Sequence, residues 1–229
     1  MRIPGTSGVT PAEALAAGAR ELGVPLDPER TALLCWFLED LLRWSARMNL
    51  TALATPDEIV RVGILDSLTC LKLIPPGSRR VVDIGSGAGF PAIPLAVMLR
   101  GAEFTLVEAS RKKVTFLRHI VRTLGLGQVR VWHGRAEDLA GDSGASGTYD
   151  VALARAVAPP LEQARLAAPF LRIGGLFLAQ LGGAAGPDML QEMVSLGYAP
   201  AGAIKIPGWL AGPGRQVQAL RLDSHPAGR

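Results

Sequence analysis

The sequence of 229 residues has no long apolar run, few aromatic residues (5%) and two cysteines. A membrane-spanning helix needs about 20 consecutive apolar residues, so the sequence predicts no membrane span. Residues 1–18 lack the apolar stretch of a signal peptide. Cys35 and Cys70 fall in apolar helical patterns and provide neither a disulfide framework nor a metal cluster. We therefore expect a cytoplasmic protein that holds no metal.

Lysine is scarce as well, because arginine makes up all but four of the 24 basic residues. The net charge is +4 and the isoelectric point is near 9.5. Arginine presents a planar fork that suits phosphate, yet the abundance of Ala, Gly and Pro also indicates a GC-rich coding bias. Composition alone favours the coding bias and leaves a polyanionic partner open. A hydrophobic fraction of 48% excludes general disorder.

Residues 1–76 have the pattern of a helical region. Thr10 and Thr55 each begin a capping box with proline at the next position, and Asp27 stands before Pro28. Apolar spacings of three and four predict a helix after each of these starts. Trp36 and Trp44 lie in the second helix and are expected in its core-facing side. The apolar face of the third helix is expected to consist of Ile59, Val62, Leu65 and Leu68.

From residue 77 onward, short apolar strands alternate with helices. The expected strands are 80–84, 104–107, 129–132, 150–154, 176–179 and 216–222. This alternation predicts a parallel, doubly wound sheet with helices on both faces. We therefore expect an α/β protein in two parts, an N-terminal helical cap at 1–76 and a Rossmann-like domain at 77–229.

A glycine-rich loop at 85–89 (GSGAG) follows the first expected strand where a helix begins. Doubly wound sheets bind ligands at this edge, and glycine lets the backbone approach a bound group closely. A dinucleotide fingerprint has its third glycine at the sixth place, which is Phe90 here. Glycines at the first, third and fifth places resemble the S-adenosylmethionine (AdoMet) loop of class I methyltransferases. AdoMet is therefore favoured over NAD as the cofactor.

Glu108 closes the second expected strand, 19 residues after Gly89. A carboxylate at this place can accept hydrogen bonds from both ribose hydroxyls of a nucleoside. The alternative is that Glu108 caps the helix that begins at Arg111, and one side chain can do both. Together, the loop and the carboxylate predict a nucleoside cofactor at the carboxyl edge of the sheet.

With these residues placed, the chain resembles the ribosomal RNA small subunit methyltransferase G family, also called glucose-inhibited division protein B. The resemblance covers roughly residues 30–180 and is carried by 49–52, 64–68, 83–95, 111–113, 116–117, 134–137 and 155–158. It implies a class I AdoMet-dependent methyltransferase fold and transfer of a methyl group to N7 of a guanosine in 16S ribosomal RNA. The implied partner is that RNA or the small ribosomal subunit.

The resemblance also implies the residues around the cofactor. Gly85 and Phe90 would flank the cofactor, and Gly87 and Gly89 would shape the loop. Glu108 would keep the ribose role already described for it.

Three further residues complete the implied cofactor site. Ala136 would contact the adenine through its backbone and Glu137 through its side chain, although a solvated loop carboxylate is the plainer interpretation of Glu137. Arg155, at the end of the fourth strand, would line the site beside the methionine end or the target base. The alternative for Arg155 is a pair with a surface acid. Asn49 and Asp66 are additional candidates for base recognition.

Three positions depart from the family pattern. Gly63 replaces a histidine, Leu181 replaces the lysine of a Lys-Gly pair, and Gln216 replaces the histidine of an Arg-His pair. All three changes remove polar groups expected on the RNA side, whereas the cofactor motifs are intact. Whether these changes reduce activity is open at this point.

Guanine N7 has a free lone pair at neutral pH and needs no general base, so alignment and desolvation can carry the transfer. We assign no catalytic acid, base or nucleophile. The alternatives are a diverged AdoMet-binding RNA module without activity and a small-molecule methyltransferase. The sequence indicates neither the target guanosine nor whether naked RNA or the assembled subunit is methylated. A monomer is expected.

Overall fold

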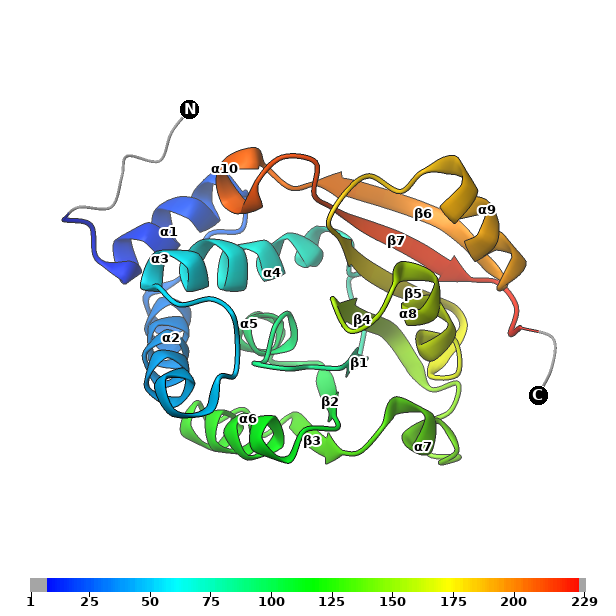
Figure 1. Cartoon of the computed structure of the whole chain (residues 1–229), viewed down its shortest axis with the longest axis horizontal. Helices are drawn as coiled ribbons and strands as arrows, with labels where there is room; N and C mark the ends of the chain where they lie inside the picture. Colours follow the sequence, from blue (N-terminus) through cyan, green and yellow to red (C-terminus); the bar gives the residue numbers. More distant parts are fainter. Residues whose placement is uncertain (1–7, 227–229) are drawn as a thin grey trace.

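The computed structural model describes residues 8–226, and seven strands within this range form one sheet (Figure 1). The strand order is β3-β2-β1-β4-β5-β7-β6. The strands from β3 to β5 are parallel, whereas β7 is antiparallel to both β5 and β6. Their bounds are β1 Arg80–Ile84, β2 Glu103–Glu108, β3 Val129–His133, β4 Tyr149–Arg155, β5 Leu171–Leu181, β6 Tyr198–Lys205 and β7 Gln216–Leu222. The predicted doubly wound α/β fold is confirmed.

Helices cover both faces of the sheet because successive strand residues point to opposite sides. Val81 of β1 belongs to a core shared with the cap, α5 and α6, and Val82 belongs to a second core shared with α7, α8 and α9. The helices of this part are α5 Ala92–Met98, α6 Arg111–Thr123, α7 Ala136–Ala140, α8 Pro160–Ala167, α9 Pro187–Ser195 and the short α10 Gly208–Ala211.

The cap consists of two long helices and a continuous helical segment over 56–72. Thr10 and Thr55 form the predicted capping boxes, and the carboxylate of Asp27 caps α2. The cap elements are α1 Pro11–Glu21, α2 Pro28–Met48, α3 Pro56–Glu58, η1 Ile59–Leu65, α4 Asp66–Leu68 and η2 Thr69–Lys72. The cap shares the first core with the sheet, and the division at residue 76 stays a prediction.

The third cap helix differs from the predicted one because η1 is a π-helix. A π-helix closes its hydrogen bonds over five residues, so spacings of three and four no longer select one face. Ile59 and Leu65 are buried as expected, but Val62 is only half-buried and Gly63 is buried in its place.

Two other expectations fail for identifiable reasons. Trp36 lies on the outward side of α2 with 54% of its surface exposed, so its prediction as a core residue is wrong. Trp44 does pack inward, with its ring 5.6 Å from that of Phe116. Strand β6 was missed because it is an edge strand of mostly exposed small residues without alternation. No helix within residues 8–226 is both long and apolar enough to cross a bilayer.

Candidate functional site

The glycine loop leaves β1 at the middle of the sheet, beside the end of β2. The main-chain N–H groups of Gly85 and Ser86 both donate to the carbonyl oxygen of Val107, at 2.9 and 3.0 Å. These bonds hold the loop against the carboxyl end of β2. The strand order reverses between β1 and β4, and a doubly wound sheet opens a ligand crevice at such a reversal. The loop therefore lies where the sequence places it.

Two of the loop glycines are required by close packing as well as by positive φ. A Cβ at Gly85 (φ 69°) would meet the side chain of Val157, and one at Gly89 (φ 94°) would lie 2.7 Å from Ile93. Only glycine adopts such backbone conformations without strain. A Cβ at Gly87 (φ 59°) would instead make only an ordinary contact, 3.7 Å from the main-chain oxygen of Gly85.

Glu108 is fixed by main-chain donors at both carboxylate oxygens. Its Oε2 accepts from the N–H of Gly87 at 2.8 Å, and its Oε1 accepts from the N–H of Ser110 at 2.7 Å. The side chain is 8% exposed. Each carboxylate oxygen can accept a second hydrogen bond, so Glu108 keeps acceptor capacity for a ligand. It thus anchors the start of α6 and the glycine loop at once.

Asp83 lies directly before the loop and is buried without a side-chain partner. Neither of its carboxylate oxygens has a hydrogen bond among residues 8–226, and the hydroxyl of Ser86 donates to its main-chain carbonyl instead. Burial raises the pKa of Asp83 to about 7, and the nearby Glu108 carboxylate acts in the same direction. A buried acid without partners is costly and marks a functional site more often than a structural one.

We expect Asp83→Asn to stabilise the protein increasingly as the pH rises. The unfolded acid ionises near pH 4 and the folded one near 7, so burial of Asp83 costs stability progressively over that interval and fully above it. The stability gained by the variant should grow by on the order of 4 kcal/mol between pH 4 and pH 8. Denaturant unfolding of both proteins without ligand measures this gain. A gain that does not change with pH would contradict the buried, unpartnered state of Asp83.

A cleft of about 590 Å³ opens above these residues at the carboxyl edge of the sheet. Seven of the eight predicted site residues line it: Gly85, Gly87, Phe90, Glu108, Ala136, Glu137 and Arg155. Gly89 is not part of the lining and packs behind the loop against α5 and α6. The structure therefore brings the predicted residues together, while their roles remain predictions.

Several lining residues were not predicted from the sequence. Residues 50–53, the loop after α2, form the cap side of the cleft, and Lys113 and Arg135 contribute basic side chains. The family-like segment at 49–52 was a signal for this loop, although a role was assigned to Asn49 alone. Asn49 ends α2 in a left-handed conformation and does not belong to the lining.

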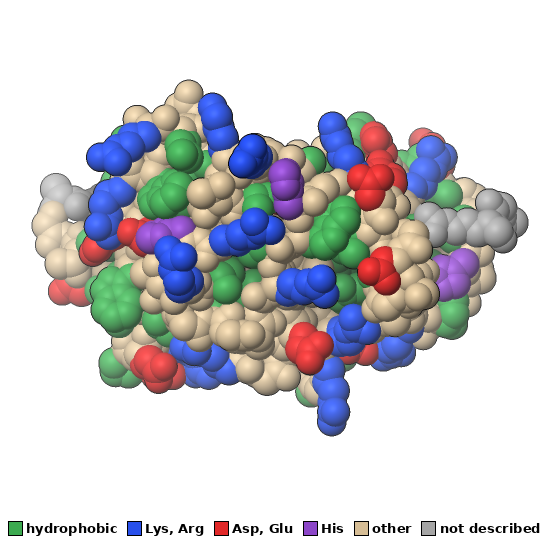
Figure 2. Space-filling view, turned by 90° about the horizontal axis from the view of Figure 1, so that it is seen from below, with side chains coloured by type: hydrophobic (Ala, Val, Ile, Leu, Met, Phe, Trp, Pro, Cys, Tyr) green, Lys and Arg blue, Asp and Glu red, His purple; other side chains and the backbone are tan. Residues whose placement is uncertain are grey.

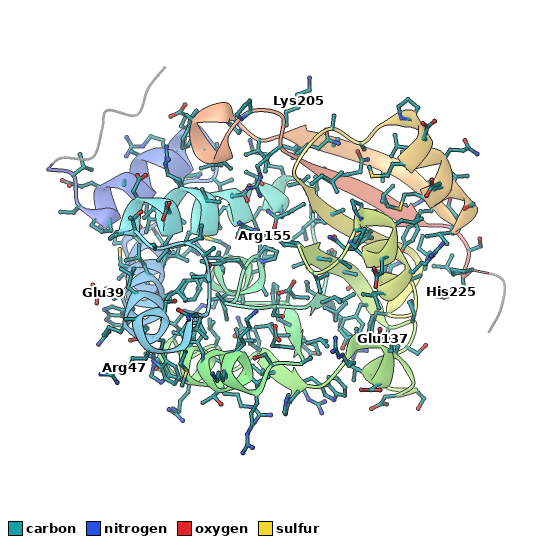
Figure 3. All side chains as sticks on the ribbon, viewed as in Figure 1. Glu39, Arg47, Glu137, Arg155, Lys205 and His225 are labelled. Atoms are coloured by element: carbon teal, nitrogen blue, oxygen red, sulfur yellow. The ribbon has the colours of Figure 1, made fainter. Side chains whose placement is uncertain are left out.

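Arg155 joins the cleft to the cap and lies near the centre of the molecule (Figure 3). Its guanidinium donates to the carbonyl oxygen of Val62 at 2.8 Å and lies 3.4 Å from the carboxylate of Asp66. Arg215 contacts the same oxygen of Asp66 at 3.0 Å. The acid partner of Arg155 is thus fully buried, whereas the alternative predicted from the sequence was a pair with a surface acid. Burial raises the pKa of Asp66, and the guanidiniums of Arg155 and Arg215 oppose that rise.

The three departures from the family pattern are all at buried positions. A Cβ at Gly63 would come within 2.6 Å of the ring of Phe90, so the ring occupies the space that a larger side chain would need. Leu181 and Gln216 face each other as partners in the β5–β7 pair. Both are buried. Because they are paired, these two departures are direct neighbours across the sheet.

The residues of the cleft fit a nucleoside with a charged tail. A ligand pocket of a few hundred Å³ suits a molecule of this size. The glycine loop exposes backbone rather than side chains, and Glu108 has acceptor capacity left at the cleft wall. Arg155 and Lys113 place positive charge along the lining, and Glu137 and Glu162 place negative charge there.

Solved structures with the same fold include methyltransferases that use S-adenosylmethionine, here abbreviated AdoMet and elsewhere SAM. Geranyl diphosphate methyltransferase in complex with SAM has a TM-score of 0.57 and 14% identity over 71% of this chain and 86% of that chain. A SAM dependent methyltransferase from Aquifex aeolicus has a TM-score of 0.54 and 15% identity over 72% and 94%. The fold is that of the class I AdoMet-dependent methyltransferases.

Sequence relatives identify the family within this class. The family model for rRNA small subunit methyltransferase G (GidB) matches residues 30–195. Relatives of that name include one from Caldanaerobacter subterraneus subsp. tengcongensis, 42% identical over 74% of this chain and 72% of its own length. Another, from Deinococcus deserti, is 46% identical over 74% and 70%. The chain belongs to the rRNA small subunit methyltransferase G family.

Proposed function

We propose that the protein transfers the methyl group of AdoMet to N7 of a guanosine in the 16S RNA of the small ribosomal subunit. Membership of the rRNA small subunit methyltransferase G family supports this activity. The observation that supports AdoMet binding is the position of the Glu108 carboxylate, which two main-chain N–H groups hold at the end of β2. The N7 position comes from the family resemblance and from the chemistry of the cleft.

Six of the cleft residues have a proposed part in holding the cofactor. Glu108 accepts hydrogen bonds from the ribose, and Gly85 and Gly87 leave room for the ligand against the loop. Ala136 and Glu137 stand at the adenine end, as the first two residues of α7. Arg155 marks the end at which the methyl group is transferred. When bound, AdoMet would supply a methyl group on a sulfonium: a lone pair of the acceptor would form a bond to the methyl carbon as the carbon–sulfur bond breaks and the neutral thioether leaves.

The protein's own contribution to the transfer is alignment and exclusion of water. Among residues 8–226 the cleft lining holds no histidine, cysteine or tyrosine. Guanine N7 does not need to lose a proton before it attacks, so a site without such a base can serve it. Phe90 and the 50–53 loop shield the cleft on the cap side, which removes water from around the reacting atoms.

Methyl transfer to unmethylated RNA tests the proposal. The purified protein, tritiated AdoMet and 16S RNA are combined, with the RNA either naked or in small subunits, and the product is mapped by mass spectrometry. We expect one methyl group per RNA, on N7 of one guanosine. Incorporation at another atom would refute the N7 assignment. AdoMet binding without incorporation would favour a non-catalytic RNA module, and methylation of small molecules alone would refute the RNA substrate.

We also propose that the protein acts in the cytoplasm, where small subunits are assembled, and that it acts as a monomer. Sedimentation of the purified protein measures the oligomeric state directly.

A further inference from the structure

The exposed side of α6 carries a row of basic residues. Arg111, Arg118 and Arg122 follow one another at spacings of seven and four, which places them along one side of a helix. All three are exposed, and Lys112 is exposed beside them. The opposite side of α6 is buried through Val114, Phe116, Leu117 and Ile120. The helix thus presents positive charge to solvent along its whole length.

Nothing within α6 neutralises this charge. The helix contains no Asp or Glu. Arg111, Lys112 and Lys113 occupy its first turn, where the helix dipole disfavours cations and favours acids. An arrangement that opposes the dipole and lacks acidic partners is better explained by an external anion than by the stability of the helix.

Ion pairs elsewhere on the molecule make the contrast clear. Several arginines outside this region have an acidic partner, as in Arg30 with Asp27, Arg172 with Asp150, and Arg221 with Asp223. Within residues 8–226, none of the Lys or Arg side chains of α6 lies within 4.0 Å of a carboxylate oxygen.

The basic side of α6 continues onto α2. The two helices lie next to each other (Figure 1), joined by His119 of α6 and Asp40 of α2 at 2.8 Å and by a tilted contact between the rings of Trp44 and His119, 5.0 Å apart. Arg47 is exposed in the last turn of α2. Figure 2 shows this face from below, with Lys and Arg side chains spread over its left half and centre, and further ones beside Asp and Glu on its right half.

The row also leads directly into the cleft. Lys113, in the first turn of α6, lines the cleft together with Glu108. On the other side of the opening, α7 carries the acids Glu137 and Asp138 in its first turn, directly after the basic Arg135. A chain of phosphates that lies along α6 would reach the cleft at Lys113.

We propose that the solvent side of α6, with Arg47 of α2, holds the phosphate backbone of the RNA whose guanosine enters the cleft. This inference rests on the proposed function. RNA fits better than a protein partner because the region is a row of arginine and lysine without a central apolar anchor, and phosphate contacts need only fixed positive charge.

Salt-dependent RNA binding tests the surface. The triple variant Lys112→Ala, Arg118→Ala, Arg122→Ala spares the cleft-lining Lys113. Its matched control changes Arg20, Arg165 and Lys205 to alanine, three exposed cations without ion pairs among the described residues. In Figure 3, Lys205 lies at the opposite end of the molecule from Arg47. Affinity for unmethylated 16S RNA is measured by filter binding from low to high salt.

Log affinity falls as log salt rises, and each phosphate contact removed should make this negative slope shallower by about one. The α6 variant should therefore lose about three units of slope and at least tenfold in affinity at low salt, with a matching rise in KM for RNA. Its AdoMet affinity by calorimetry and its kcat at saturating RNA should stay within about twofold. The control should keep the wild-type slope.

Two outcomes would refute the assignment of this surface to RNA binding and leave the proposed function intact. One is an equal loss of slope in both variants while the wild type still methylates RNA. The other is weaker binding to assembled subunits but unchanged binding to naked RNA, which would assign the surface to a ribosomal protein. A wild-type protein that binds AdoMet and methylates no RNA would instead refute the proposed function.

Discussion

Glu108→Ala should lower the affinity for AdoMet by roughly a hundredfold and leave the affinity for RNA within about twofold. The carboxylate has acceptor capacity for two ligand hydroxyls, and hydrogen bonds to a charged group contribute about 1.5 to 3 kcal/mol each. A loss of about 3 kcal/mol corresponds to a factor of roughly 100. The substitution also frees the N–H groups of Gly87 and Ser110, which loosens the loop. Calorimetry with AdoMet and filter binding with RNA measure the two affinities.

The matched control lies on the same strand. Glu103→Ala removes an exposed carboxylate from the first residue of β2, at the far end from the cleft, and should leave AdoMet affinity unchanged. Glu108→Gln is a second variant of nearly the same shape, and it should also bind weakly because an amide offers one acceptor oxygen instead of two. Thermal unfolding establishes that each variant is folded. Equal losses of AdoMet and RNA affinity for Glu108→Ala would contradict the role of Glu108.

The sequence predicted those parts of the site that depend on local pattern. The loop at 85–89 and the carboxylate of Glu108 each stand directly after an apolar strand, and parallel strands bring their carboxyl ends to one edge. A residue's place directly after a strand was therefore enough to predict its place at this edge. Arg155 was placed in the site for the same reason.

Contacts between distant segments were beyond prediction. Asp66, Arg155 and Arg215 come from the cap, from β4 and from the connection before β7, and only the packing of the cap on the sheet joins them. No spacing pattern in the sequence predicts that these three side chains are in contact. Local pattern also failed at η1, because a π-helix has a different period.

The largest change in stability should come from Phe37→Ala in the cap. Phe37 is fully buried, and its ring lies 5.2 Å from that of Phe90 at the cleft and 6.5 Å from that of Phe116 in α6. Removal of a buried phenyl group costs the transfer free energy and leaves a cavity, together about 3 to 5 kcal/mol. Because Phe90 lines the cleft, the variant should also bind AdoMet more weakly. Denaturant unfolding and calorimetry measure the two effects.

The neighbouring residue provides the control and also tests how the two parts of the chain are joined. Trp36→Ala removes a larger ring that is 54% exposed, so the free energy of unfolding should change by less than about 0.5 kcal/mol. If the cap and the sheet unfold as one unit through their shared core, Phe37→Ala should shift a single transition as a whole. Two transitions, of which only one moves, would instead establish the cap at 1–76 as a separate domain. Similar losses for Phe37→Ala and Trp36→Ala would contradict the packing of α2 described here.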